Sequence, residues 1–118
     1  MQFFIAAAAL LGLASAAKVT DATLRDNNGL QSAELSIDGV KCSATSAAAL
    51  GARQIACPGS AFSWHVDGSA SDYQVTLFKG TNTGDPQASA KLPVDCRAGG
   101  AGQNDQVCTQ VGDATVDI

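Results

Sequence analysis

The fold class follows from the stretch FSWHVDGSASDYQVTLFK, residues 62–79. Apolar Phe62, Trp64 and Val66 alternate with polar residues, and the same period of two returns in YQVTL, residues 73–77. Such alternation is typical of β-strands with one buried and one solvated face. The Asp67-Gly68 pair after the first run suits a tight hairpin turn, because both residue types tolerate positive φ angles. The stretch therefore predicts two antiparallel strands.

The same pattern covers most of the chain outside this stretch. Ala33, Leu35 and Ile37 alternate with polar residues, and Asn-Gly or Asp-Gly pairs stand at residues 28–29 and 38–39. Only residues 44–51 invite a helix, of barely two turns. We predict strands over residues 19–26, 30–37, 40–44, 53–57, 61–66, 72–79, 87–92, 106–111 and 114–118. Short strands with frequent turns predict an all-β fold, a single compact antiparallel barrel or sandwich.

The first 17 residues are typical of a secretory signal peptide. Residues 3–13 form a short apolar run that is too short for a permanent membrane span. The small residues of ASAA, 14–17, match a cleavage site, so we expect the mature chain to start near Ala17 or Lys18. We therefore expect a secreted, extracellular protein whose single β domain covers residues 18–118.

In a secreted protein, the four cysteines are expected to form disulfides. An even number of cysteines in an oxidising compartment predicts two disulfides, and the residues alone leave all three pairings open. The cysteines are Cys42, Cys57, Cys96 and Cys108. No short Cys-x₂₋₄-Cys pair accompanies the single histidine, so we expect no zinc or other metal.

Charge and motifs argue against several classes of function. Seven Lys and Arg against 11 Asp and Glu leave a net charge of −4, which disfavours nucleic acid and anionic membranes as partners. The glycine-rich residues 97–102 lack the Lys-Ser/Thr of a nucleotide-binding loop. Any Ser-His-Asp triad would need His65, yet no Gly-x-Ser-x-Gly elbow is present. We predict no catalytic residues and no cofactor; a small hydrolase built on His65 is the remaining enzymatic alternative.

Two residues are candidates for contact with a partner. Phe78 falls on the polar face of its strand, where an exposed aromatic would anchor a partner unless both faces are buried. Arg97, next to Cys96, is the second candidate. In a small-ligand carrier, Trp64 and Tyr73 would line an apolar pocket together with Phe78.

A resemblance to a known family is carried by LPVDCRAGG, residues 92–100, continued by VC at 107–108. Looser matches are CPGSAFSW, residues 57–64, and DYQVTL, residues 72–77. On these motifs the chain resembles the family of the Alternaria major allergen, which includes fungal secreted elicitors of the plant hypersensitive response. The match covers most of residues 19–118.

The resemblance implies properties that the residues alone do not. It implies a compact β-barrel or sandwich with disulfides Cys42–Cys57 and Cys96–Cys108, and no established enzymatic activity. It also implies association with plant defence proteins of the thaumatin-like class and, for some members, with small phenolic ligands. The chain lacks the additional N-terminal cysteine of the namesake's covalent dimer, so we expect a monomer or a non-covalent homodimer.

These expectations combine into one function. We expect a secreted fungal effector or elicitor, a virulence-type protein that acts on a plant extracellular defence protein or receptor. The alternative is an extracellular carrier of a small phenolic or flavonoid ligand.

Overall fold

The structure, a computed structural model, describes residues 16–80 and 84–118. Most of the predicted signal peptide lies outside the described residues, so that prediction and its cleavage site stay untested. Among the described residues, no helix has the length and apolar character needed to cross a membrane. The regular secondary structure of the described chain consists almost entirely of strands. In chain order these are β1 (Ala16–Asn27), β2 (Leu30–Ile37), β3 (Val40–Ala44), β4 (Phe62–Ser69), β5 (Asp72–Lys79), β6 (Gln87–Leu92), β7 (Val94–Ala98), β8 (Asp105–Gln110) and β9 (Ala114–Asp117), with the short helix α2 (Ala47–Leu50) between β3 and β4.

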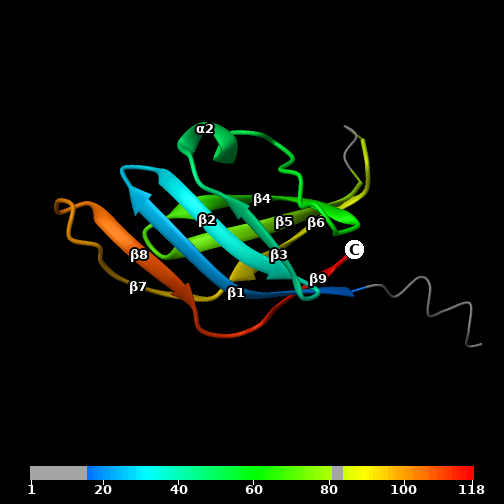
Figure 1. The fold of residues 1–118 in the computed structure, drawn as a ribbon. Coiled ribbons are helices and arrows are strands. Elements are labelled where there is room, and N and C mark those ends of the chain that lie inside the picture. Colours follow the sequence, from blue (N-terminus) through cyan, green and yellow to red (C-terminus); the bar gives the residue numbers. More distant parts are fainter. Residues whose placement is uncertain (1–15, 81–83) are drawn as a thin grey trace, which may run out of the picture.

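The strands form two stacked antiparallel sheets. The first has the order β3-β2-β1-β8-β7, with β9 also paired to β1, and the second has the order β4-β5-β6. Figure 1 shows the second sheet lying behind the first, with α2 above them. Within the described residues, no strand ladder joins the two sheets into a closed ring. The predicted all-β class is confirmed, and the arrangement is a sandwich.

Strand β1 holds the first sheet together. Along one side it pairs with β2, and along the other side it pairs first with β9 and then with β8. The ladder is interrupted at Asp21, which has a positive φ of 56° and lies at a register shift typical of a β-bulge. Gln110 fills the gap between β9 and β8: its side chain accepts from the Ala22 N–H at 2.9 Å and donates to the Val19 carbonyl at 2.8 Å.

The core lies between the sheets and follows the predicted alternation. In β5, Tyr73, Val75 and Leu77 are completely buried, while Gln74 is exposed. Trp64 of β4 is also fully buried. Burial of side chains of this size contributes roughly 1.5–3 kcal/mol each. Two disulfides add covalent links, Cys42–Cys57 and Cys96–Cys108, which is the pairing that the family resemblance implied.

The structure corrects two element predictions. Residues 53–57 do not form a strand: Ile55 makes an isolated bridge with Trp64, after which the disulfide of Cys57 takes the chain toward β3. Residues 94–98, which we did not predict as a strand, form β7. Asp95 and Arg97 do alternate with apolar residues, but the run is only five residues long, its apolar residues are small, and it leads directly into the glycine-rich turn, so it is hard to distinguish from a loop. The glycine-rich turn begins only after Ala98.

Candidate functional site

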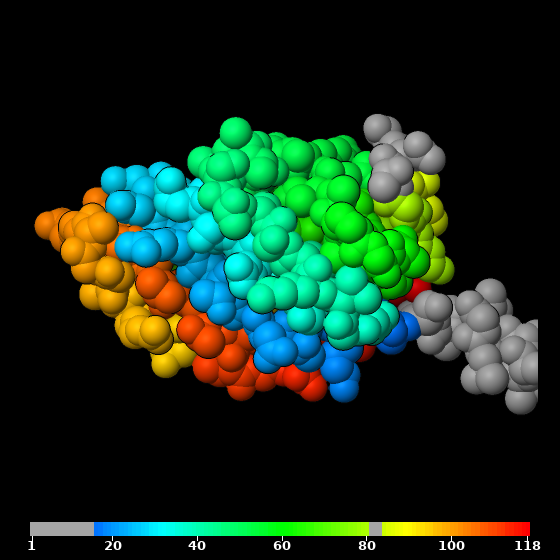
Figure 2. Space-filling view, in the orientation of Figure 1, coloured from blue at the N-terminus to red at the C-terminus, as the bar shows by residue number. Residues whose placement is uncertain are grey.

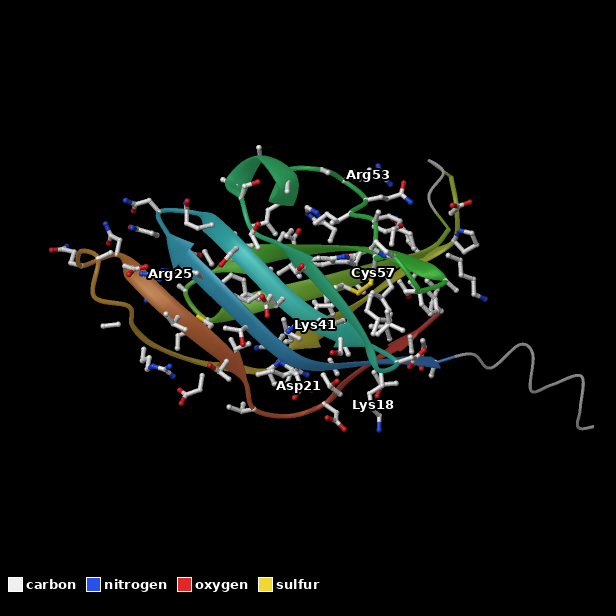
Figure 3. All side chains as sticks on the ribbon, viewed as in Figure 1. Lys18, Asp21, Arg25, Lys41, Arg53 and Cys57 are labelled. Atoms are coloured by element: carbon white, nitrogen blue, oxygen red, sulfur yellow. A yellow bond between two sulfur atoms is a disulfide. The ribbon has the colours of Figure 1, made fainter. Side chains whose placement is uncertain are left out.

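The three aromatic candidates are core residues. Trp64 and Tyr73 are completely buried, and Phe78 is only 4% exposed. The indole N–H of Trp64 has no hydrogen-bond partner within the described residues. Phe78 is covered because the connection between α2 and β4 crosses the outer face of the second sheet. The Arg53 guanidinium lies 5.8 Å from the centre of its ring, and Figure 3 shows Arg53 on this connection. Of the two alternatives that the sequence leaves open at Phe78, the structure has the covered one: Phe78 is buried although it lies on the same face of β5 as the exposed Gln74.

The polar candidates lie elsewhere. Arg97 is exposed on β7, away from the aromatic residues of the core. His65 is half-buried on β4, and its Nδ1 lies 3.1 Å from the carbonyl oxygen of Ala52. Ala52 lies on the connection between α2 and β4 that covers Phe78. The contact of His65 is therefore with the backbone of this connection and is a structural one. The structure does not bring Arg97 together with Trp64, Tyr73 or Phe78 into one site.

A recess lies at one end of the sandwich, and we call it the loop-end recess. It has a volume of about 340 Å³. Three connections supply its walls: the β1–β2 turn, the β4–β5 turn and the β7–β8 loop. Figure 2 shows the β7–β8 loop, in orange, protruding at this end beside the blue β1–β2 turn. The lining residues are Asp26, Asn28, Gly29, Ser69, Ala70, Gln103, Asn104 and Gln106.

Asp26 joins the recess to the core. Its side chain is mostly buried; Oδ1 accepts a hydrogen bond from the Gly29 N–H at 2.8 Å. Oδ2 accepts from the Tyr73 hydroxyl at 2.6 Å. Burial, and then the hydrogen bond to Asp26, raise the pKa of Tyr73, so the phenol remains a protonated donor. This bond connects β1 of the first sheet to β5 of the second.

Asp105 holds the β7–β8 loop in place. Its carboxylate is buried and receives two bonds from Arg25, from Nε at 3.1 Å and from the terminal guanidinium nitrogen at 2.6 Å. The Ala101 N–H donates a third bond at 3.0 Å. The hydrogen bond from Arg25 is the largest influence on Asp105 and lowers the pKa of its carboxyl group. Figure 3 shows Arg25 at this end of the molecule.

A glycine allows the loop to close over this carboxylate. A Cβ atom at Gly99 would overlap the side chain of Asp105. The backbone of the loop therefore lies directly against the buried carboxylate of Asp105. The walls of the loop-end recess are fixed by hydrogen bonds and one ion pair, which makes them a preorganised surface.

The chemistry of the recess is that of hydrogen bonding. Asn28, Gln103, Asn104 and Gln106 carry carboxamides, each of which both donates and accepts. Within the described residues, no group of three or more His, Cys, Asp or Glu is placed to hold a metal ion. Such a surface is suited to recognition of another polar surface.

No pattern in the sequence indicates this recess. Its residues come from segments up to 80 positions apart, and only the sheet topology brings them together. The Asn28-Gly29 turn was recognised as a hairpin signal, but the carboxamides of the β7–β8 loop carry no motif of their own.

Comparisons with known proteins agree with this fold. The family model described as Alternaria alternata allergen 1 matches residues 29–108. A crystal structure of Alternaria alternata allergen Alt a 1 has a TM-score of 0.63 with 24% identity, over 86% of this chain and 85% of the other. A second crystal structure of that allergen has a TM-score of 0.58 with 23% identity, over 86% and 90% of the two chains. No protein with curated annotation matches this chain.

Proposed function

Since the chain belongs to the Alternaria alternata allergen 1 family, we propose that it is a secreted fungal effector or elicitor that binds a component of plant defence outside the cell. Its action is recognition rather than catalysis, and its partner is a plant extracellular protein or receptor. A thaumatin-like pathogenesis-related protein is the first candidate. The single observation that carries this proposal is the loop-end recess, a preorganised polar surface built from both sheets.

Rigidity supports a role in protein recognition. The Asp26–Tyr73 bond fixes the β1–β2 turn against the second sheet, and the Arg25–Asp105 pair fixes the β7–β8 loop. The Cys96–Cys108 disulfide closes the base of the same loop. Loops that are already ordered lose less conformational entropy on binding, so more of the interaction energy appears as affinity. The carboxamides at the rim supply paired donors and acceptors for a partner's backbone and side chains.

The carrier alternative has less support. The residues expected to line its apolar pocket, Trp64, Tyr73 and Phe78, are packed in the core, and none of them lines the loop-end recess. A titration of Trp64 fluorescence with a flavonoid measures this directly. We expect no saturable quenching, whereas saturable quenching at micromolar ligand would favour the carrier.

The test is capture from plant apoplastic fluid. The oxidised protein, residues 18–118, is immobilised, and captured proteins are identified by mass spectrometry. A reduced and alkylated sample is the folding control. We expect a defence protein on the oxidised form alone, and the purified partner should then bind in solution. Capture by neither form would count against the proposal.

Two variants place the contact on the molecule. Asn104→Arg puts a bulky charge at the rim of the loop-end recess and should weaken binding of the purified partner at least tenfold. Gln74→Arg makes a similar change on the exposed face of β5 and should leave binding unchanged. Equal binding by both variants would exclude the recess as the contact surface.

A further inference from the structure

Strand β7 is an open edge of the first sheet. It is the last strand in the order β3-β2-β1-β8-β7, and among the described elements β8 is the one with extensive contacts to it. Figure 1 shows β7 at the outer margin of the sheet. The two edge strands of the second sheet, β4 and β6, are both partly covered. Ile55 forms a bridge with Trp64 of β4, and β6 contacts β9. An unprotected edge presents unpaired backbone donors and acceptors to any strand that can reach it.

The hydrogen bonds of β7 define which groups face outward. Gly99 N–H donates to the Asp105 carbonyl at 2.8 Å, and Val111 N–H donates to the Pro93 carbonyl at 2.9 Å. Both bonds belong to one antiparallel register, in which odd-numbered residues of β7 point their backbone groups toward β8. The N–H and C=O groups of Val94, Cys96 and Ala98 therefore point to the open edge.

The side chains of β7 carry two unused charges. Asp95 and Arg97 are both exposed and are two residues apart, so they lie on the same face of the strand. Within the described residues, neither side chain makes a hydrogen bond or an ion pair, although Lys18, Arg25, Lys41 and Lys91 each have an acidic partner. The open edge thus carries one negative and one positive charge with no partner inside the described chain.

We propose that β7 pairs antiparallel with β7 of a second copy of this chain, about a two-fold axis at Cys96. This register places Cys96 opposite Cys96 and Val94 opposite Ala98 of the other copy. These are the residues with outward backbone groups, so each opposed pair exchanges two N–H···O=C bonds. The two first sheets become one continuous sheet across the dimer.

The same register pairs the charges. Asp95 lies opposite Arg97 of the second copy, and by symmetry the pair occurs twice. These positions are non-hydrogen-bonded pairs, in which the opposing Cα atoms are about 4.5 Å apart and the side chains are closest. Moving the axis by one residue would oppose Asp95 to Asp95, or Arg97 to Arg97. The charges therefore select the register about Cys96 and reject its neighbours.

Charge exchange tests this geometry. Asp95→Arg gives a strand with two positive charges, and Arg97→Asp gives a strand with two negative charges. Each variant alone opposes like charges at both pairs, so we expect its dimerisation to weaken at least tenfold. An equimolar mixture restores two opposite-charge pairs, so we expect a heterodimer of wild-type affinity. Sedimentation velocity over a concentration series, to about 1 mM of disulfide-bonded chain, measures the association of each variant and of their mixture.

Controls separate the edge from general electrostatics. Lys79→Asp and Asp67→Arg make the same changes of charge at exposed positions on β5 and β4 and should leave association unchanged. Association in the mixture also shows that both variants are folded. A wild-type chain that stays monomeric throughout, or a mixture that does, overturns the proposal.

Amide hydrogen exchange tests the register by residue. With rising concentration, the N–H groups of Val94, Cys96 and Ala98 should become protected. Those of Asp95 and Arg97, which already bond to β8, should be protected at every concentration. A dimer without this alternation would use another surface.

Discussion

Removal of one hydroxyl group tests how the two sheets are connected. The Tyr73 hydroxyl donates to the Asp26 carboxylate at 2.6 Å, from the second sheet to the first. Tyr73→Phe deletes this bond and keeps the buried ring in place. A hydrogen bond to a charged acceptor contributes about 1.5–3 kcal/mol, and the carboxylate that remains is mostly buried, with its other bond from Gly29. We expect the variant to lose about 2 kcal/mol of unfolding free energy.

Urea unfolding followed by Trp64 fluorescence measures this loss, because Trp64 is completely buried in the folded chain. With an m-value of about 1.5 kcal/mol/M, the midpoint should fall by roughly 1.3 M urea. The melting temperature should fall by about 8–16 °C for a domain of this size.

Ser89→Ala is the matched control. It also deletes a hydroxyl from the second sheet, where Ser89 and Thr76 share an exposed hydrogen bond of 2.7 Å that water can replace. It should cost less than about 0.5 kcal/mol. If Tyr73→Phe proves as stable as Ser89→Ala, the bond does not hold the sheets together, and our account of the recess is wrong.

Three further predictions concern the disulfides, the ion pair and a turn. Peptide mapping without reduction should recover Cys96 with Cys108, and replacing both by serine should cost about 3 kcal/mol, as expected for a separation of 12 residues. The lowered pKa of Asp105 means that the folded state favours the ionised carboxyl; this contribution is present above the ordinary value of 3.8 and is lost as pH falls below it. Asp105→Asn should therefore flatten the decline of the urea midpoint as the pH falls below about 4, and an unchanged slope would contradict this. Gly68 and Gly29 have nearly equal φ angles of 128° and 126°. A Cβ atom at Gly68 would overlap the backbone of the next strand, whereas a Cβ atom at Gly29 would meet open space. Gly29→Ala should cost about 1–3 kcal/mol, and Gly68→Ala should cost at least twice as much by urea denaturation.

The sequence predicted the strands well where one face is buried by large residues. Residues 30–37, 40–44, 72–79 and 87–92 were predicted with the bounds that the structure has. The pattern failed at β7, because this short alternating run has small apolar residues and leads directly into a glycine-rich turn, which makes it hard to distinguish from a loop. It failed again at residues 53–57, where a disulfide redirects the chain.

The candidate site was less predictable than the fold. Phe78 broke the alternation of its strand, and the sequence left open whether it was exposed or covered. The answer depends on the connection that carries Arg53 over its ring, which is a tertiary contact between residues 25 positions apart. Asp26 and Asp105 are acidic residues with no motif. Their roles follow from partners in distant strands, and no local pattern encodes those partners.

The position of β1 has a consequence for biosynthesis. The first described strand of the chain is completed on one side by β8 and β9, which are synthesised long after it. Until these residues leave the ribosome, one side of β1 has no native partner, and the hairpin of β1 with β2 exposes its core face. Long-range pairing of this kind forms slowly and leaves intermediates open to aggregation. The first sheet is therefore completed only after β8 and β9 have left the ribosome, so the yield of folded protein should depend on how well chaperones protect β1 until then.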